Sequence, residues 1–166
     1  MTLSQQLIER IRAEFPKYPE KRAVLLTALH FVQEEQGGWV PPELIPEIAA
    51  LLEIHPIDVK EVASFYHMFH EHPVGRSHLQ VCTNLSCALR GARGVVRRLE
   101  GVLGVRPGEL SADGEFSVEE VQCLGSCGSA PVIQVNNEPY LENVALGDVE
   151  TLVAGLRGRR LAAVGE

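Results

Sequence analysis

The four cysteines of the chain form two close pairs, and no other cysteine is present. Cys82 and Cys87 lie in VCTNLSC, and Cys123 and Cys127 lie in QCLGSC. Four residues separate the first pair, three separate the second, and 35 residues lie between the pairs. This spacing favours an iron–sulfur cluster held by all four thiolates. Zinc is the alternative, because it also binds four cysteines in pairs with short gaps. Spacing alone leaves both metals open.

Composition excludes several functions. The net charge of −7 argues against nucleic acid as a partner, because phosphate binding needs a basic surface. The N-terminal stretch MTLSQQLIERIRAEF carries charges throughout, so it does not resemble a secretory signal, and no apolar run reaches transmembrane length. We therefore expect a cytoplasmic protein without direct membrane insertion. In that compartment paired cysteines indicate a metal site in preference to disulfides, and the CxxC motif of a redox dithiol is absent.

Residues 1–73 predict a helical bundle. Apolar residues recur at helical spacing in four segments that proline and glycine separate, near residues 3–15, 20–36, 44–52 and 56–66. The turn-rich stretch HPVG at residues 72–75 marks a boundary, which divides the chain into domains 1–73 and 74–166.

Residues 74–166 predict a small α/β domain with a mixed sheet. The expected elements, in order, are a strand at 77–82, a helix at 85–103, strands at 116–121, 132–135 and 139–142, and a helix at 148–156. Asn136-Asn137 is the expected turn between the last two strands. This β-α-β-β-α order resembles a thioredoxin-like module, and Pro131 resembles the proline that such folds often hold in cis. The fold class is therefore α+β, a helical bundle followed by a thioredoxin-like domain.

Several stretches of the chain, including both cysteine pairs, resemble one family. They are VCTNLSC, QCLGSCGSAPVIQVN, VASFYHMF, the GGWVPPE turn and the approach PGELSADGEFSVEEVQC, and together they span nearly the whole chain. They resemble the small [2Fe–2S] subunit of the NADH dehydrogenase module of respiratory complex I, an NADH:quinone oxidoreductase; this small subunit is a thioredoxin-like ferredoxin. The resemblance implies that one [2Fe–2S] cluster is bound by Cys82, Cys87, Cys123 and Cys127.

The resemblance also implies the surroundings of the chain. The cluster would exchange electrons with FMN on a partner flavoprotein subunit that also binds NADH, and further iron–sulfur subunits would complete the complex. The bundle would dock the partner, and the chain would be peripheral to the membrane through the complex. Equivalent subunits of NAD-linked formate dehydrogenases or hydrogenases fit as well, as does a stand-alone thioredoxin-like ferredoxin, although the bundle argues against a free carrier. A zinc-stapled structural module is the alternative from a different class.

No independent active site is expected. The chain has neither a GxGxxG nor a GxxxxGK motif, and no serine–histidine–aspartate signature or paired carboxylates stand out. It is therefore expected to be a non-catalytic electron-transfer subunit of an oxidoreductase. Histidines 67, 70 and 72 are interpreted as surface or cap residues in preference to a second metal site.

Two further groups of side chains lie outside the cysteine motifs. The residues Ser64, Phe65, Tyr66 and Phe69 are expected to pack, either in the bundle core or at the seam between the two domains, in preference to forming a contact surface. Arginines 90, 93, 97 and 98 predict a solvated helix face, of which one or two members could steer docking to an acidic partner.

Overall fold

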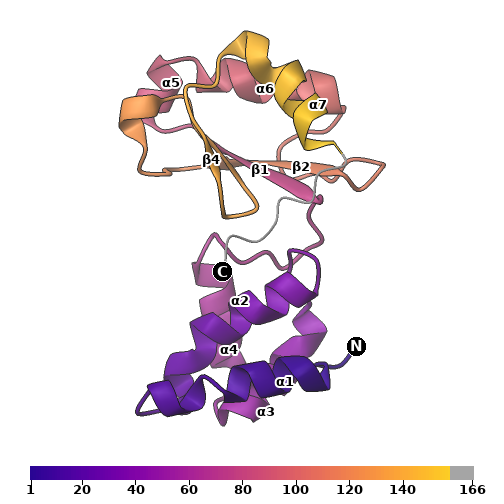
Figure 1. The fold of residues 1–166 in the computed structure, drawn as a ribbon, viewed down its shortest axis with the longest axis vertical. Helices are drawn as coiled ribbons and strands as arrows, with labels where there is room; N and C mark the ends of the chain where they lie inside the picture. The colour runs from indigo at the N-terminus through magenta and orange to yellow at the C-terminus, as the bar shows by residue number, and fades with distance from the viewer. Residues whose placement is uncertain (158–166) are drawn as a thin grey trace. The chain divides into compact units, whose positions relative to one another are not determined.

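The computed structural model describes residues 1–157, so the last nine residues of the expected second domain, 158–166, lie outside the described part. The chain divides into two compact units, Met1–Pro73 and a second unit that begins at Val74. The first unit is helical, and the second combines a four-stranded sheet with helices (Figure 1). The predicted α+β fold class is confirmed.

Four α-helices build the first unit. They are α1 (Gln5–Arg12), α2 (Leu25–Glu35), α3 (Ile45–Leu52) and α4 (Pro56–Phe65), with the 3-10 turns η1 (Phe15–Lys17), η2 (Lys21–Val24) and η3 (Pro42–Leu44) between them. Side chains fix where helices begin. Ser4 Oγ accepts from the N–H of Leu7 at 3.1 Å, which caps α1. At the start of α4, His55 Nδ1 accepts from the N–H of Ile57 at 3.3 Å.

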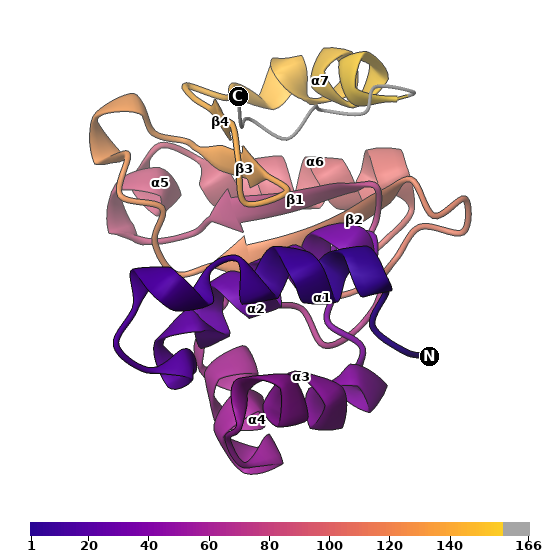
Figure 2. The same ribbon diagram turned by 60° about the horizontal axis from the view of Figure 1, so that its bottom comes forward.

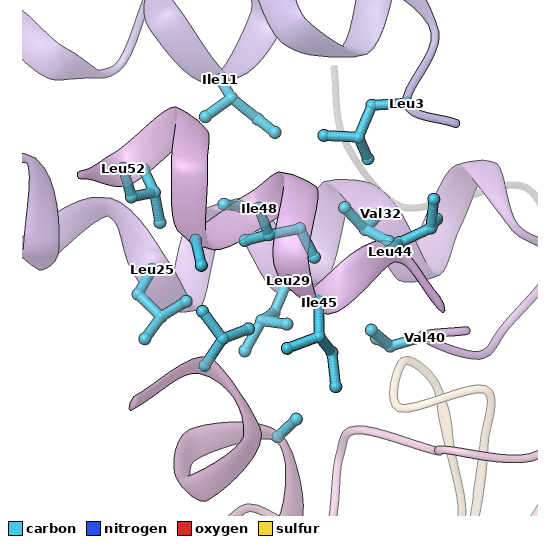
Figure 3. Packing of buried hydrophobic residues seen from close by; sticks show 14 of the residues in the cluster. Leu3, Ile11, Leu25, Leu29, Val32, Val40, Leu44, Ile45, Ile48 and Leu52 are labelled. Atoms are coloured by element: carbon cyan, nitrogen blue, oxygen red, sulfur yellow. The ribbon is translucent and has the colours of Figure 1, made fainter. Parts of the chain in front are cut away.

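The predicted apolar stripes of the four helices meet in one core. Figure 3 shows Ile11, Leu29 and Ile48, from three different helices, directed into the same interior. All three are fully buried. The buried members of this core are Leu3, Leu7, Ile11, Val24, Leu25, Ala28, Leu29, Val32, Val40, Leu44, Ile45, Ile48, Ala49, Leu52, Val59, Ala63 and Phe69. Burial of one such side chain contributes roughly 1.5–3 kcal/mol, so packing of these stripes is what holds such short helices.

The end of α4 corrects one prediction. Ser64 is exposed, Phe65 is 75% exposed and Tyr66 is 39% exposed, so none of the three packs into the bundle core; Phe69 does. The reason is local: α4 stops at Phe65, and the extended backbone of Tyr66 turns the chain before the helical face returns to the core. His67 and His72 are exposed.

The second unit contains four strands and three α-helices within the described residues. They are β1 (Ser77–Cys82), α5 (Leu85–Leu89), α6 (Ala92–Leu103), β2 (Phe116–Val121), β3 (Ile133–Val135), β4 (Tyr140–Leu141) and α7 (Val149–Leu156), with the 3-10 turns η4 (Cys127–Ser129) and η5 (Leu146–Asp148). The sheet order is β2-β1-β3-β4. β1 pairs in parallel with β2 and antiparallel with β3, which gives the mixed sheet that was predicted.

Helices α5, α6 and α7 lie over one face of this sheet (Figures 1 and 2). The apolar side chains of β1 alternate toward them, and Leu79 and Val81 are both fully buried. They pack with Val95 and Leu99 of α6 and Val153 of α7. This core fixes the end of β1, where the first cysteine lies.

The predicted helix over 85–103 is wrong in one respect, because the structure breaks it into α5 and α6. Gly91 stands between them with φ +96°, a left-handed conformation that ends α5. An isolated glycine in an apolar helical pattern does not reveal such a break. As a result α5 is a separate short helix.

Two local predictions are confirmed in this unit. Asn136 and Asn137 have φ values of 55° and 61°, as the turn of a tight β3–β4 hairpin requires. The Ala130–Pro131 peptide bond is cis.

Replacing either of two glycines near the end of α6 with alanine should change the stability of the protein, in opposite directions. Gly101→Ala should stabilise the protein by roughly 1 kcal/mol, because the position is helical and a Cβ there would meet no atom within 4 Å. Gly104→Ala should destabilise it by roughly 1 kcal/mol, because φ is +69°. Urea unfolding followed by circular dichroism measures both. Equal midpoints for the two variants would contradict the assignment of Gly104 as the helix-ending residue.

Candidate metal centre

The first cysteine pair is buried where β1 gives way to α5. Cys82 is the last residue of β1 and is 4% exposed, and Cys87 lies within α5 and is 2% exposed. Asn84 begins the helix, since its Oδ1 accepts from the N–H of Leu85 at 2.7 Å. The two side chains belong to one packed cluster with Ala92 and Ala130. The strand-to-helix turn therefore places two sulfurs side by side.

The second pair lies on an exposed loop after β2. Cys123 and Cys127 are both exposed, and Cys127 begins the η4 turn. Gly125 has φ +76°, and its N–H donates to Cys123 Sγ at 3.4 Å. A backbone amide aimed at sulfur stabilises a thiolate and lowers the charge density of a metal–sulfur centre.

The pKa of Cys87 depends on cysteines from both pairs. Burial, together with a hydrogen bond to Cys82, raises the pKa of the Cys87 thiol to about 11. The negative charges of Cys82 and Cys127 act in the same direction, whereas a backbone hydrogen bond at Val132 lowers the pKa. The structure therefore brings Cys82 and Cys127 into electrostatic range of Cys87, and Cys123 lies at the start of the loop that carries Cys127. A metal that binds Cys87 has to displace its proton.

The donor set suits a four-sulfur metal centre. All four cysteines lie in the part of the chain that the structure describes, and all four are free thiols. Two come from a rigid, buried turn and two from an exposed loop that carries a sulfur-directed amide. These features fit both an iron–sulfur cluster and zinc.

Glu142 holds the second cysteine loop, a role that the sequence did not indicate. Its Oε1 accepts from Ser126 Oγ at 2.6 Å and from Ser129 Oγ at 2.5 Å. These two hydrogen bonds, the one from Ser126 first, keep the pKa of Glu142 below its ordinary value. Tyr140 Oη also donates to the carbonyl of Leu124 at 3.0 Å. The end of the β4 hairpin therefore fastens both sides of Cys127.

Glu142→Ala should weaken metal retention. The change removes the acceptor shared by two hydroxyls, so the loop that carries Cys127 loses its fixed position. Outer contacts of this kind typically change metal affinity by about 10-fold or more. The rate of metal loss is measured from the decrease in visible absorbance of the metal-loaded protein after a chelator is added. Glu142→Gln keeps one acceptor oxygen and should retain metal better than Glu142→Ala. Glu138→Ala, a glutamate in the same hairpin, is the control. Equal loss rates for Glu142→Ala and Glu138→Ala would contradict the role of Glu142.

A comparison with known protein families bears on the choice of metal. The family described as "Thioredoxin-like [2Fe-2S] ferredoxin" matches residues 11–157. The chain belongs to this family. Membership supports an iron–sulfur cluster for this chain in preference to zinc. It also confirms the resemblance drawn from the cysteine motifs.

Curated relatives extend over most of the ferredoxin chain. It is 49% identical over 162 residues to NADH-quinone oxidoreductase subunit 2 of Thermus thermophilus, a match that covers 96% of this chain and 88% of the relative. It is 39% identical over 149 residues to an NADH-quinone oxidoreductase subunit of Rhizobium meliloti, a match that covers 90% of this chain and 88% of the relative.

A solved structure shares the fold. The crystal structure of an NAD+-reducing [NiFe]-hydrogenase in the H2-reduced state matches 81% of this chain with a TM-score of 0.69 and 21% identity. The ferredoxin chain spans only 22% of that hydrogenase chain. Within residues 1–157, none of the helices has both the length and the apolar character needed to cross a bilayer.

Proposed function

We propose that this ferredoxin is an electron-transfer subunit of an NADH-oxidising complex, most specifically an NADH:quinone oxidoreductase. In this proposal Cys82, Cys87, Cys123 and Cys127 bind one [2Fe–2S] cluster. One observation carries it: four free thiols, from a buried turn and an exposed loop, in a chain 49% identical over 96% of its length to an NADH-quinone oxidoreductase subunit.

The residues of the site have distinct tasks in this proposal. A [2Fe–2S] cluster, once bound, gains and loses one electron at a time. Cys82 and Cys87 anchor it to the buried end of β1, and Cys123 and Cys127 cover it from the loop. The N–H of Gly125 offsets part of the negative charge on the sulfurs. Since Cys123 and Cys127 are exposed, the cluster would not be sealed inside the core of the second unit.

The partners follow from the same proposal. The cluster exchanges electrons with FMN on a flavoprotein subunit that also binds NADH, and further iron–sulfur subunits belong to the complex. Residues 1–73 dock on the partner, and residues 74–166 hold the cluster. The chain itself carries no catalytic residue and is peripheral to the membrane through the complex. The fold shared with an NAD+-reducing hydrogenase makes an equivalent subunit of an NAD-linked hydrogenase the second candidate.

Metal analysis of the protein purified without oxygen tests the cluster. We expect about two irons and two sulfides per chain, visible absorbance that bleaches on reduction, and an EPR signal from the reduced protein at low temperature. Zinc without inorganic sulfide would end the electron-transfer proposal.

Reduction by NADH tests the partner. The isolated protein should not be reduced by NADH, whereas addition of the flavin-bearing subunit from the same organism should allow it. Quinone-dependent or hydrogen-dependent turnover of the assembled complex distinguishes the two candidate settings.

A further inference from the structure

A groove lies between α6 and the loop that leads into η5. It has a volume of about 700 Å³, and we call it the arginine groove. The residues that define it are Arg90, Arg93, Arg97, Pro131, Asn143 and Leu146. Ala88, the neighbour of Cys87 in α5, also lines the groove. The groove therefore begins beside the buried pair of the cysteine site.

The charge of the arginine groove is opposite to that of the whole protein. Three guanidinium groups line it and no carboxylate does, although the chain carries a net charge of −7. Among the described residues 1–157, none of these three arginines forms an ion pair. Arg98, in the same helix, differs because it pairs with Glu150. The arginine groove therefore presents three uncompensated positive charges.

Exposed leucines accompany these charges. Leu146 is 54% exposed and lies across α6, since a Cβ placed on Gly94 would be 3.7 Å from Leu146 Cδ1. Leu85 and Leu89 of α5 are 69% and 80% exposed. They are one helical turn apart and so share a face of α5, on either side of Cys87 in sequence. Large exposed apolar side chains next to charges are typical of a protein interface.

We propose that the arginine groove and Leu89 form the docking surface for a segment of the flavin-bearing subunit. This segment carries carboxylates, which face the arginines, and an apolar side chain, which packs on Leu89. This inference rests on the proposed function and adds where that partner contacts the ferredoxin. Charge complementarity selects an acidic occupant, because three arginines without a local carboxylate oppose any basic surface. Electron tunnelling decays steeply with distance, so a contact that begins one residue from Cys87 favours transfer.

Charge reversal in the groove tests the docking surface. The cluster-loaded protein is titrated against the flavin-bearing subunit from the same organism, with binding followed by biolayer interferometry at low and high salt. Arg93→Glu together with Arg97→Glu should weaken binding by about tenfold or more, mainly through slower association, and should flatten its salt dependence. Leu89→Ser should instead speed dissociation.

The control is Arg106→Glu, which reverses an arginine in the loop after α6, outside the groove. It should bind within about twofold of the unaltered protein. Visible absorbance should be the same in all variants, because none of these positions is a proposed ligand.

Three outcomes overturn the inference at different levels. If the double variant binds the flavin-bearing subunit as tightly as the unaltered protein does, the docking surface lies elsewhere and the proposed function still stands. Absence of any binding by the unaltered protein would contradict the proposed function, and the docking surface with it. Binding of NADH to the isolated protein that the double reversal abolishes would reassign the groove to a small anion.

Discussion

Cys87→Ala is expected to yield a protein that retains almost no cluster. Cys87 is 2% exposed and packs in one cluster with Cys82, so its sulfur lies at the closed end of the site. In the proposed cluster, its removal would take away one sulfur ligand, and the neighbours Ala92 and Ala130 that pack there carry no atom that can replace it. The affinity for the cluster should fall by more than roughly 100-fold, because even the loss of an outer contact lowers metal affinity by about 10–100-fold.

Iron and sulfide analysis with visible absorbance measures this effect. Ser86→Ala, in the same helix, and Arg93→Ala, in the arginine groove, should both keep the cluster. Circular dichroism should show that the sheet and the bundle still form in Cys87→Ala, although the loop around Cys127 loosens because metal binding and local folding are coupled. A Cys87→Ala protein with full cluster content would contradict the ligand assignment.

Gly75→Ala is expected to destabilise the second unit by roughly 3 kcal/mol or more. A Cβ on Gly75 would lie 2.3 Å from the carbonyl carbon of Phe116 and 2.5 Å from the nitrogen of Ser117. Both atoms are backbone, so no side-chain rotation relieves the clash. The N–H of Gly75 also donates to Ser117 Oγ at 2.8 Å, which holds this close approach. Relief requires the backbone at Gly75 and the start of β2 to move apart.

Thermal unfolding measures the cost. For a domain of this size, a loss of about 3 kcal/mol lowers the midpoint by roughly 12–24 °C. Gly147→Ala is the matched control, because a Cβ there meets nothing within 4 Å. If Gly75→Ala and Gly147→Ala have the same thermal midpoint, the backbone near Gly75 relieves the clash with little loss of stability, which would contradict the prediction.

The sequence predicts the strands better than the helices. β1 and β2 have the predicted bounds because apolar residues alternate between clear turn signals at both ends. The break at Gly91 depends on a positive φ that the apolar pattern of the helix does not encode. The exposure of Phe65 was also missed, because periodicity treats the last turn of a helix like any other. Tertiary context decides both.

Some features of the site could be predicted from the sequence, and others depend on the folded chain. Cysteine spacing predicts the candidate ligands, since their identity is local information. Glu142 was not predicted, because it reaches back 16 and 13 residues to Ser126 and Ser129 without any pattern that links them. The arginine groove likewise requires that Leu146 lie across α6, which follows only from the folded chain.

The unequal setting of the two cysteine pairs has a consequence for cofactor turnover. The backbone at the end of β1 is hydrogen-bonded on both sides. The N–H of Cys82 donates to the carbonyl of Val132 at 3.1 Å, and the N–H of Thr83 donates to the carbonyl of Val121 at 3.0 Å. The loop of Cys123 and Cys127 depends on a few surface hydrogen bonds and can open by itself at lower free energy. A cluster held by these four sulfurs would therefore be inserted and released when the loop of Cys123 and Cys127 opens. Cys82 and Cys87 would stay in place, and the sheet would remain folded.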